Sequence, residues 1–277
     1  KINQASKENV NLNSFQKKSK NIFSYFLEKS IMTGKYVAFI SPKSLISAPE
    51  FDDLRKIILS RDVIRIIDHG EKAFDGDVKI ETIGITLGPQ SNNLDVTVES
   101  LITKTIQVHK KDYIFDSSYP SWLLYRNTDF DKTAKKMELG TFKVFRDRQI
   151  TKAITKPHGK YRVLKSRNIG NNIIKDIKDY DCYIDEIEHL KVSEFINKKV
   201  ILVPNLSYYP RGCMLPKNAI VDGSAAILIP LKSITKSHID FFSSHEFHQY
   251  YRIARNYGTR SLNIDNNSVY FFGRLKK

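Results

Sequence analysis

The sequence is poor in cysteine and has no long apolar run, and each absence excludes a class of protein. Only Cys182 and Cys213 occur among its 277 residues. Two cysteines are too few for a disulfide scaffold or a cysteine-rich zinc site, so we expect reduced, buried thiols. No apolar run reaches the roughly 18 residues that a membrane helix needs, and no signal-peptide core opens the chain. We therefore expect a soluble, intracellular protein without a membrane partner.

Metal and thiol chemistry also lack their usual residue patterns. Residues 245–248 read His-Glu-Phe-His, but their histidines are three residues apart, where the zinc-protease signature requires four. Neither cysteine lies beside a suitable His-Asp arrangement for nucleophilic catalysis. We expect no metal site and no catalytic thiol.

What the sequence does contain is positive charge, and most of it lies in the second half. The whole chain has 45 Lys and Arg against 30 Asp and Glu. From Thr141 onward there are 24 basic and 12 acidic residues, and residues 143–167 hold nine basic residues against the single acid Asp147. Such a field favours a polyanionic partner, and interleaved tyrosines and arginines suit nucleic acid. The alternative is a solvated basic face of the kind common in Lys- and Asn-rich chains.

The first half alternates helical and strand-like apolar patterns. An apolar stripe over residues 14–32 predicts an amphipathic helix, and the apolar run 36–40 predicts a central strand covered on both faces. A capping box with proline at 47–50 predicts the start of a second helix. Residues 63–67 and 83–87 predict two further strands, so the order indicates a layered α/β arrangement.

Beyond these elements the pattern becomes less regular. Residues 95–115 predict an antiparallel extension of the sheet, and a short polar helix is expected near residues 128–137. One helix is expected to begin near Ser237 and to end at a glycine C-cap at Gly258. Short strands between irregular loops are expected at residues 142–145, 161–164, 200–203 and 226–229.

Five segments of the first half follow one another in an order typical of a known family. They are residues 21–30, 34–45, the pair Leu54-Arg55, residues 66–74 and residues 80–87. Over roughly residues 15–90 the chain resembles the C-terminal part of the catalytic domain of N6-adenine DNA methyltransferases of restriction-modification systems, the TaqI-like and Type I modification-subunit group. The resemblance implies the closing half of a Rossmann-like methyltransferase sheet in a bacterial, cytoplasmic enzyme, with S-adenosylmethionine as cofactor.

Two motifs of that family are absent from the chain. One is the Asn/Asp-Pro-Pro-Tyr/Phe loop that holds the target amino group, and the other is the glycine-rich loop that receives S-adenosylmethionine. By the resemblance, both would lie upstream of Lys1, and the chain has no initiator methionine. We expect a truncated chain or the distal part of a split enzyme, inactive alone, whose cofactor is bound mainly by the upstream part.

Phe74 occupies the place where the TaqI-like group has an aromatic residue that stacks on the flipped adenine. Chemistry on a base within a duplex requires base flipping, and an aromatic face offsets part of the unstacking cost of a few kcal/mol. The alternative is a core role for Phe74 beneath the turn at Gly76.

The second half carries a separate resemblance. Residues 140–150 and 159–169 are similar to the opening of target-recognition domains, and residues 258–264 are similar to the element that closes them. Such domains occur in Type I specificity subunits and are fused to methyltransferases in related Type II enzymes. The resemblance covers nearly all of residues 140–277 and implies an α+β domain that reads a sequence on double-stranded DNA.

The side chains of this half suit that role. Arginine can bond guanine, and Asn or Gln can bond adenine, through paired hydrogen bonds in the major groove, whereas lysine more often contacts phosphate. Residues 208–211 are either a loop inserted into the groove or a turn packed on aromatic residues. Asn171, Asn172 and Asn205 are further base-reading candidates. The main DNA-binding candidates are Arg146, Arg148, Gln149, Lys160, Arg162, Lys165, Arg167, Asn168, Tyr208, Arg211, Arg252, Arg255 and Arg260.

We therefore expect residues 1–115 to belong to the methyltransferase catalytic domain, 116–138 to be a linker and 139–277 to be the target-recognition domain. The leading interpretation is a site-specific DNA adenine-N6 methyltransferase. One alternative is a specificity module that recruits a separate catalytic subunit. Another is a bifunctional enzyme with a nuclease further upstream. A restriction endonuclease or another methyltransferase subunit is the expected protein partner.

Overall fold

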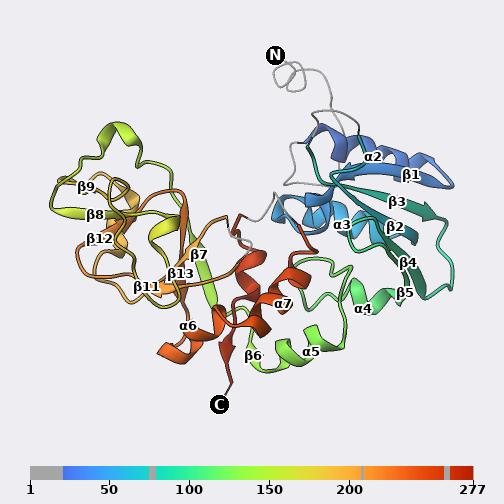
Figure 1. Cartoon of the computed structure of the whole chain (residues 1–277). Helices are drawn as coiled ribbons and strands as arrows, with labels where there is room; N and C mark the ends of the chain where they lie inside the picture. Colours follow the sequence, from blue (N-terminus) through green and yellow to red (C-terminus); the bar gives the residue numbers. More distant parts are fainter. Residues whose placement is uncertain (1–20, 75–78, 207–208, 259–262, 277) are drawn as a thin grey trace. The chain divides into compact units, whose positions relative to one another are not determined.

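The chain divides into two compact units, Lys1–Leu124 and Tyr125–Lys277. The computed structural model describes residues 21–74, 79–206, 209–258 and 263–276. Figure 1 shows the elements of each unit along the chain. The expected linker, residues 116–138, does not stand apart: its first part belongs to the first unit and the rest to the second. The division between Leu124 and Tyr125 thus falls within the expected linker.

A five-stranded sheet forms the frame of the first unit. Its spatial order is β1-β3-β2-β4-β5. β3 runs antiparallel between β1 and β2, β4 is parallel to β2, and β5 is antiparallel to β4. Of the antiparallel extension that the sequence predicts, only the pairing of β5 with β4 is antiparallel, because β4 joins the sheet parallel to β2. The strands are β1 (Val37–Pro42), β2 (Asp62–Gly70), β3 (Thr82–Gly88), β4 (Asp95–Ser100) and β5 (Thr105–Lys110).

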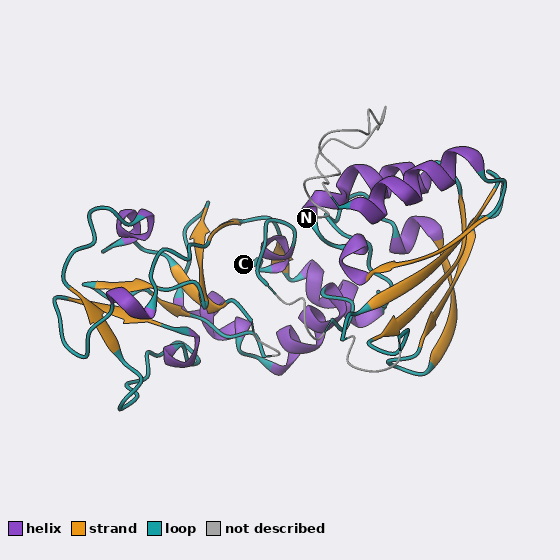
Figure 2. Cartoon of the chain, turned by 90° about the horizontal axis from the view of Figure 1, so that it is seen from above, coloured by secondary structure: helices purple, strands orange, loops and turns teal. Residues whose placement is uncertain are grey.

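Helices cover one face of this sheet. α2 (Ile22–Thr33) and α3 (Asp52–Leu59) lie on the same side, and Figure 2 shows them gathered there. Side chains that alternate along the strands, such as Ile66 and Ile85, are buried beneath them. Burial of these apolar faces is the main force that joins helices to sheet.

A buried arginine closes the loop before α3. The Arg55 guanidinium donates to the carbonyl oxygens of Leu45 at 2.8 Å, Ala48 at 3.0 Å and Pro120 at 3.1 Å. α3 is preceded by a turn of 3-10 helix, η2 (Pro49–Phe51), which has Pro49 at its first position, as the sequence indicates. The N-cap of η2 is Ala48, which makes no side-chain cap bond, so this helix begins one residue later than the capping box at Ser47 predicts.

β1 is not the central strand that its apolar sequence predicts. Among the described residues it pairs with β3 alone and therefore lies at an edge of the sheet. Ile40 of β1 is 51% exposed, and the adjoining Tyr36 is 65% exposed. At the opposite edge, Ile106 and Val108 of β5 are also exposed. The apolar pattern of β1 consequently reflects a surface that the described chain leaves uncovered.

Two small sheets form the core of the second unit, and a helical layer and a third, two-stranded sheet complete it. One sheet has the order β11-β10-β13-β7, with each neighbouring pair antiparallel, and the other has the order β12-β8-β9. Residues from both sheets, such as Val163 and Leu202, share one apolar core. The strands are β7 (Phe142–Phe145), β8 (Tyr161–Leu164), β9 (Cys182–Ile184), β10 (Ile201–Pro204), β11 (Cys213–Met214), β12 (Ala219–Val221) and β13 (Ala225–Pro230).

The helical layer brings together segments from the beginning and from the end of the second unit's sequence. α5 (Thr128–Lys135), the predicted polar helix, packs on α7 (His245–Ala254) through the stacked rings of Phe130 and Tyr250, whose centroids are 4.8 Å apart. Glu246 of α7 accepts hydrogen bonds from Thr133 and Lys136, and these hydrogen bonds, with the Lys136 charge, lower its carboxyl pKa despite partial burial. Just beyond α5, β6 (Met137–Glu138) pairs with β14 (Arg274–Leu275) near the end of the chain.

The single helix that the sequence predicts near the end of the chain is divided into two helices. α6 (Lys236–Phe242) and α7 (His245–Ala254) are separated at Ser243, and the Ser244 hydroxyl caps α7 by accepting from Phe247 N at 3.1 Å. The chain leaves α7 through left-handed backbone at Asn256 and Tyr257, with φ of 49° and 54°. The predicted glycine C-cap at Gly258 is therefore wrong, since the left-handed turn falls on the two residues before it.

The overall result is the mixed α/β architecture that the sequence predicts, built from several sheets and short helices. Within the described residues, no helix is both long enough and apolar enough to cross a membrane.

Candidate DNA interface

The short 3-10 helix η4 (Ser166–Asn168) brings together several of the predicted DNA-binding residues. Asn168 itself is fully buried, at 0% exposure. Its side-chain amide donates to Asp181 at 2.6 Å and to Lys175 O at 3.0 Å, and its oxygen accepts from Lys165 N at 2.9 Å. The structure corrects the expected surface position of Asn168, because as folded it presents no surface to a base.

Arg162 is engaged in the same network. Its guanidinium forms ion pairs with Asp176 at 2.6 Å and Asp181 at 2.7 Å, and it also donates to Lys175 O. Both acids lie 14 to 19 residues further along the chain. Arg162 therefore holds the segment 175–181 against β8, and most of its donors are occupied.

Three other candidate arginines bind backbone carbonyl groups of their own unit. Arg146 donates to Ile264 O at 3.0 Å, Arg211 donates to Ile169 O at 2.6 Å, and Arg255 donates to a backbone oxygen at 3.2 Å. Burial lowers the pKa of Arg146, with a smaller effect from the Arg148 charge, and burial likewise lowers the pKa of Arg211. Their contact with DNA stays a prediction, but their present bonds give them a structural role.

The exposed cations form a different subset of the candidates. Arg148, Lys160, Arg167 and Arg252 are all exposed. Arg252 lies over the Tyr257 ring, with its guanidinium carbon 4.9 Å from the ring centroid. These four side chains are the ones that can reach a ligand without breaking a bond that holds the fold.

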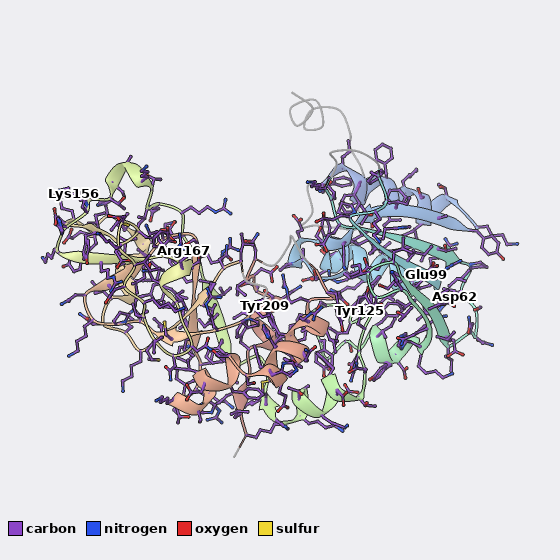
Figure 3. All side chains as sticks on the ribbon, in the orientation of Figure 1. Asp62, Glu99, Tyr125, Lys156, Arg167 and Tyr209 are labelled. Atoms are coloured by element: carbon purple, nitrogen blue, oxygen red, sulfur yellow. The ribbon has the colours of Figure 1, made fainter. Side chains whose placement is uncertain are left out.

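Two of these exposed arginines, together with Lys165, make a basic patch around η4. Ser166 N donates to the Ser224 hydroxyl at 2.9 Å, which fixes η4 to the turn at residues 222–224. Arg148 packs on the same turn, where a Cβ added at Gly223 would lie only 2.8 Å from the Arg148 Cγ. We refer to Arg148, Lys165 and Arg167 as the η4 patch. Figure 3 marks Arg167 at this place, with Lys156 in another part of the unit, where Lys156 pairs with Asp185 at 2.8 Å.

The remaining predicted DNA-binding residues either contact their own unit or lie outside the described residues. The Gln149 side-chain oxygen accepts from Lys191 N at 2.9 Å, although the residue is exposed. Tyr209 is 68% exposed and lies against the His248 ring at 4.5 Å. Tyr208 and Arg260 lie outside the described residues.

Phe74 is not the core residue of the alternative interpretation. It follows the end of β2 and is 48% exposed. An aromatic ring with an open face can stack on a planar ligand, as the resemblance implies. That role stays a prediction.

Three charged side chains are buried at the base of the segment that carries Phe74. Lys43, which follows β1, lies 2.6 Å from Asp68 of β2 and 3.9 Å from Glu81, which precedes β3. Their exposures are 5%, 0% and 6%. Lys43 N also donates to Glu81 O at 2.8 Å, and the Asp68 carboxylate accepts from Gly70 N at 3.0 Å. This Lys43 cluster ties both ends of the segment 71–80 to the end of β1. Sequence reasoning missed it, although a lysine directly after an apolar strand is a usable signal.

The cysteines match their expected structural role in part. Cys213 is buried in β11, and burial raises the pKa of its thiol to about 12. Cys182 is partly exposed in β9. Among the described residues, no group of three His, Cys, Asp or Glu side chains could hold a metal ion.

No protein-family profile matches the sequence, and no curated protein matches it. Solved structures do match. The Type IIL restriction-modification enzyme MmeI, solved in complex with DNA, matches with a TM-score of 0.52 and 12% identity over 90% of this chain and 41% of that chain. The type IIG restriction endonuclease BpuSI matches with a TM-score of 0.35 and 10% identity over 92% of this chain and 42% of that chain. The chain thus spans less than half the length of either enzyme. The likeness to MmeI shows that this chain has a fold found in a restriction-modification enzyme.

Proposed function

We propose that this chain is the sequence-reading part and the closing sheet of a site-specific DNA adenine-N6 methyltransferase of a restriction-modification system. The observation that carries the proposal is the fold, which over 90% of this chain resembles a Type IIL restriction-modification enzyme that was solved in complex with DNA. The second unit would read the site, and the first unit would complete the sheet and base pocket of the catalytic domain.

The second unit supports DNA binding by its positive charge and by the exposed arginines of the η4 patch, Arg148 and Arg167. The η4 patch places two arginines and a lysine together on one part of the surface, within the half of the chain that carries the positive excess. Lysine and arginine contacts to phosphate dominate the affinity of proteins for DNA, and arginine adds base recognition.

The first unit supports a sheet that continues beyond β1. Among the described residues, no further strand pairs with its outer edge, which lies beside the exposed side chains of Tyr36 and Ile40, and α2 adds exposed Ile22 and Phe26. An exposed apolar strand edge is a template for pairing with another strand and is otherwise a liability. The partner that we propose is the cofactor-binding half of the same sheet.

The residues present do not fit S-adenosylmethionine. The sequence has no Asn-Pro-Pro-Tyr motif and no glycine-rich loop between a strand and a helix. At the end of β1, where an open α/β sheet commonly binds ligands, the structure instead buries the Lys43 ammonium between two carboxylates. The proposal therefore places the cofactor on another part of the enzyme, and Phe74 is the one residue here that we assign to the target base.

The first experiment is modified-base sequencing of plasmid DNA from a methylase-free host that expresses the complete gene encoding this chain. N6-methyladenine confined to one short motif would support the methyltransferase and would name its site. Unmodified DNA, despite soluble protein, would favour the runner-up function, a specificity module that needs a separate catalytic subunit.

A second experiment tests the DNA interface directly. Equilibrium binding of duplex DNA would be compared between the wild type and the double variant Arg148→Ala with Arg167→Ala over a range of salt concentrations. Loss of two cations should weaken binding and reduce the slope of log affinity against log salt by up to about 2. Lys132→Ala with Lys135→Ala is the charge-matched control, since both lysines are exposed on α5 and neither belongs to the η4 patch. Equal loss in both variants would remove the η4 patch from the interface.

A further inference from the structure

Two cations converge on the ring of Tyr180, which no sequence pattern singles out. The Lys165 Nζ lies 3.9 Å from the ring centroid, and the Arg167 guanidinium carbon lies 4.8 Å from it. Lys165 also donates to the Tyr180 carbonyl oxygen. Arginine and lysine over an aromatic face gain cation–π attraction. Tyr180 thus provides a platform for Lys165, which directly precedes η4, and for the exposed side chain of Arg167.

This platform is fixed from below by two residues that the sequence suggests as DNA contacts. Asn168 and Arg162 both bond the carboxylate of Asp181, at 2.6 and 2.7 Å. The Asp181 carboxylate also accepts from Ile177 N at 3.1 Å, and Tyr180 N donates to Ile177 O at 3.1 Å. The turn that carries Tyr180 is therefore held by charge-assisted bonds, which are stronger than neutral ones.

The donors of Arg167 remain available. The side chain is exposed, and within the described part of the chain its guanidinium makes no hydrogen bond or ion pair. Arg162 and Arg211, by contrast, bond carboxylate or carbonyl oxygens. A guanidinium that stacks through its face keeps its N–H groups at its rim, where they can form two parallel bonds.

We propose that Arg167, positioned by Tyr180, reads a guanine in the recognition sequence. The inference rests on the proposed function and adds to it a base and a positioning residue. The O6 and N7 atoms of guanine accept two parallel hydrogen bonds in the major groove, and this pairing with arginine is the commonest specific contact. Because the ring already restricts the Arg167 side chain, less rotational freedom is lost when it binds.

The test is selection of bound sequences from a pool of randomised duplexes by the complete enzyme, with methylation of the same pool as a second readout. Arg167→Ala should relax one guanine position of the selected site by about 5- to 150-fold, while the other positions keep their preference. Arg167→Lys should retain most of the affinity but lose that preference. Tyr180→Leu should keep guanine as the preferred base with a several-fold smaller ratio.

Replacement of each guanine of the site by 7-deazaguanine, which lacks the N7 acceptor, identifies the position concerned. Wild-type binding should weaken at one guanine only, and Arg167→Ala should be insensitive there. A uniform loss over all sequences in Arg167→Ala would show a phosphate contact and would overturn the inference, as would a selected site without a G·C pair. Selected binding without methylation would remove the methyltransferase proposal and leave this test intact. Lys132→Ala again serves as the control for loss of charge.

Discussion

Replacement of Lys43 by methionine should destabilise the first unit strongly. Methionine keeps an apolar stem of similar length but removes the ammonium that lies 2.6 Å from Asp68 and 3.9 Å from Glu81. All three residues are at most 6% exposed, so water cannot replace the lost cation. Removal of one partner from a buried ion pair typically costs about 3–5 kcal/mol, because the remaining charge is left without compensation.

The single tryptophan gives this prediction a local assay. Trp122 belongs to the first unit, is 4% exposed and packs on Phe115 with ring centroids 4.7 Å apart. Its fluorescence during urea unfolding therefore reports on the first unit and not on the second. With a slope of about 2 kcal/mol per molar urea, the loss predicts a midpoint lowered by roughly 2 M in Lys43→Met.

Two companion variants separate charge from packing. Lys43→Met combined with Asp68→Asn and Glu81→Gln should recover part of the stability, since a buried set without net charge can replace a buried ion cluster at little cost. Lys132→Met breaks an exposed ion pair and should change stability by less than about 1 kcal/mol. A Lys43→Met midpoint within about 0.5 M of the wild type, near the uncertainty of such a comparison, would refute the reasoning.

Three further outcomes follow from individual side chains. Burial opposes ionisation of Asp62, but hydrogen bonds, chiefly from Lys111, and the Lys111 charge lower its pKa below the ordinary 3.8. The resulting stabilisation is present above that pH and is lost as pH falls through the folded-state value, so Asp62→Asn should show a weaker loss of urea midpoint between pH 5 and pH 3 than the wild type. A thiol reagent at pH 8 should label partly exposed Cys182 first and Cys213 only slowly, since the pKa of Cys213 is raised to about 12; simultaneous labelling, followed by mass spectrometry, would contradict its burial. Phe74→Ala in the complete enzyme should lower methylation turnover far more than duplex affinity, and equal turnover would exclude a stacking role for this exposed ring.

The strands could be predicted from the sequence because their signal is local. The runs rich in apolar residues at 142–145 and 161–164 coincide with β7 and β8, since short runs with β-branched and aromatic side chains favour strands. The division of the last helix could not be foreseen in the same way. The same apolar stripe continues through α6 and α7, and only the cap made by Ser244 distinguishes two helices from one.

The local pattern of β1 correctly predicts a strand, but its position in the middle of the sheet was predicted wrongly. An apolar strand is predicted equally well whether its neighbours belong to the same chain segment or to another part of a sheet. Only the pairing with β3 alone, together with exposed Tyr36 and Ile40, shows that one side is open in the described chain.

The DNA-binding residues could be predicted only in part, because the count of basic residues does not show which of them form ion pairs within the protein. The acids that neutralise Arg162 lie at Asp176 and Asp181, outside the basic stretch where the sequence shows only Asp147. A long-range ion pair of this kind leaves no local pattern, so Arg162 and Arg167 look alike in the sequence. In the fold, the first supports a turn and the second extends from the platform that this turn carries.

Because the residues that hold the turn differ from the residue that extends from it, substitutions at the two places should affect sequence specificity differently. A substitution at buried Asn168 or at Asp181 would alter the turn beneath Tyr180 and is expected to cost stability as well as recognition, because it breaks bonds between buried or charged groups. A substitution at Arg167 breaks no bond of the described fold. If Arg167 reads a base, the exposed end of the platform can therefore vary freely while the buried end is constrained, and new recognition sequences would arise at the rim of η4 without loss of the fold beneath it.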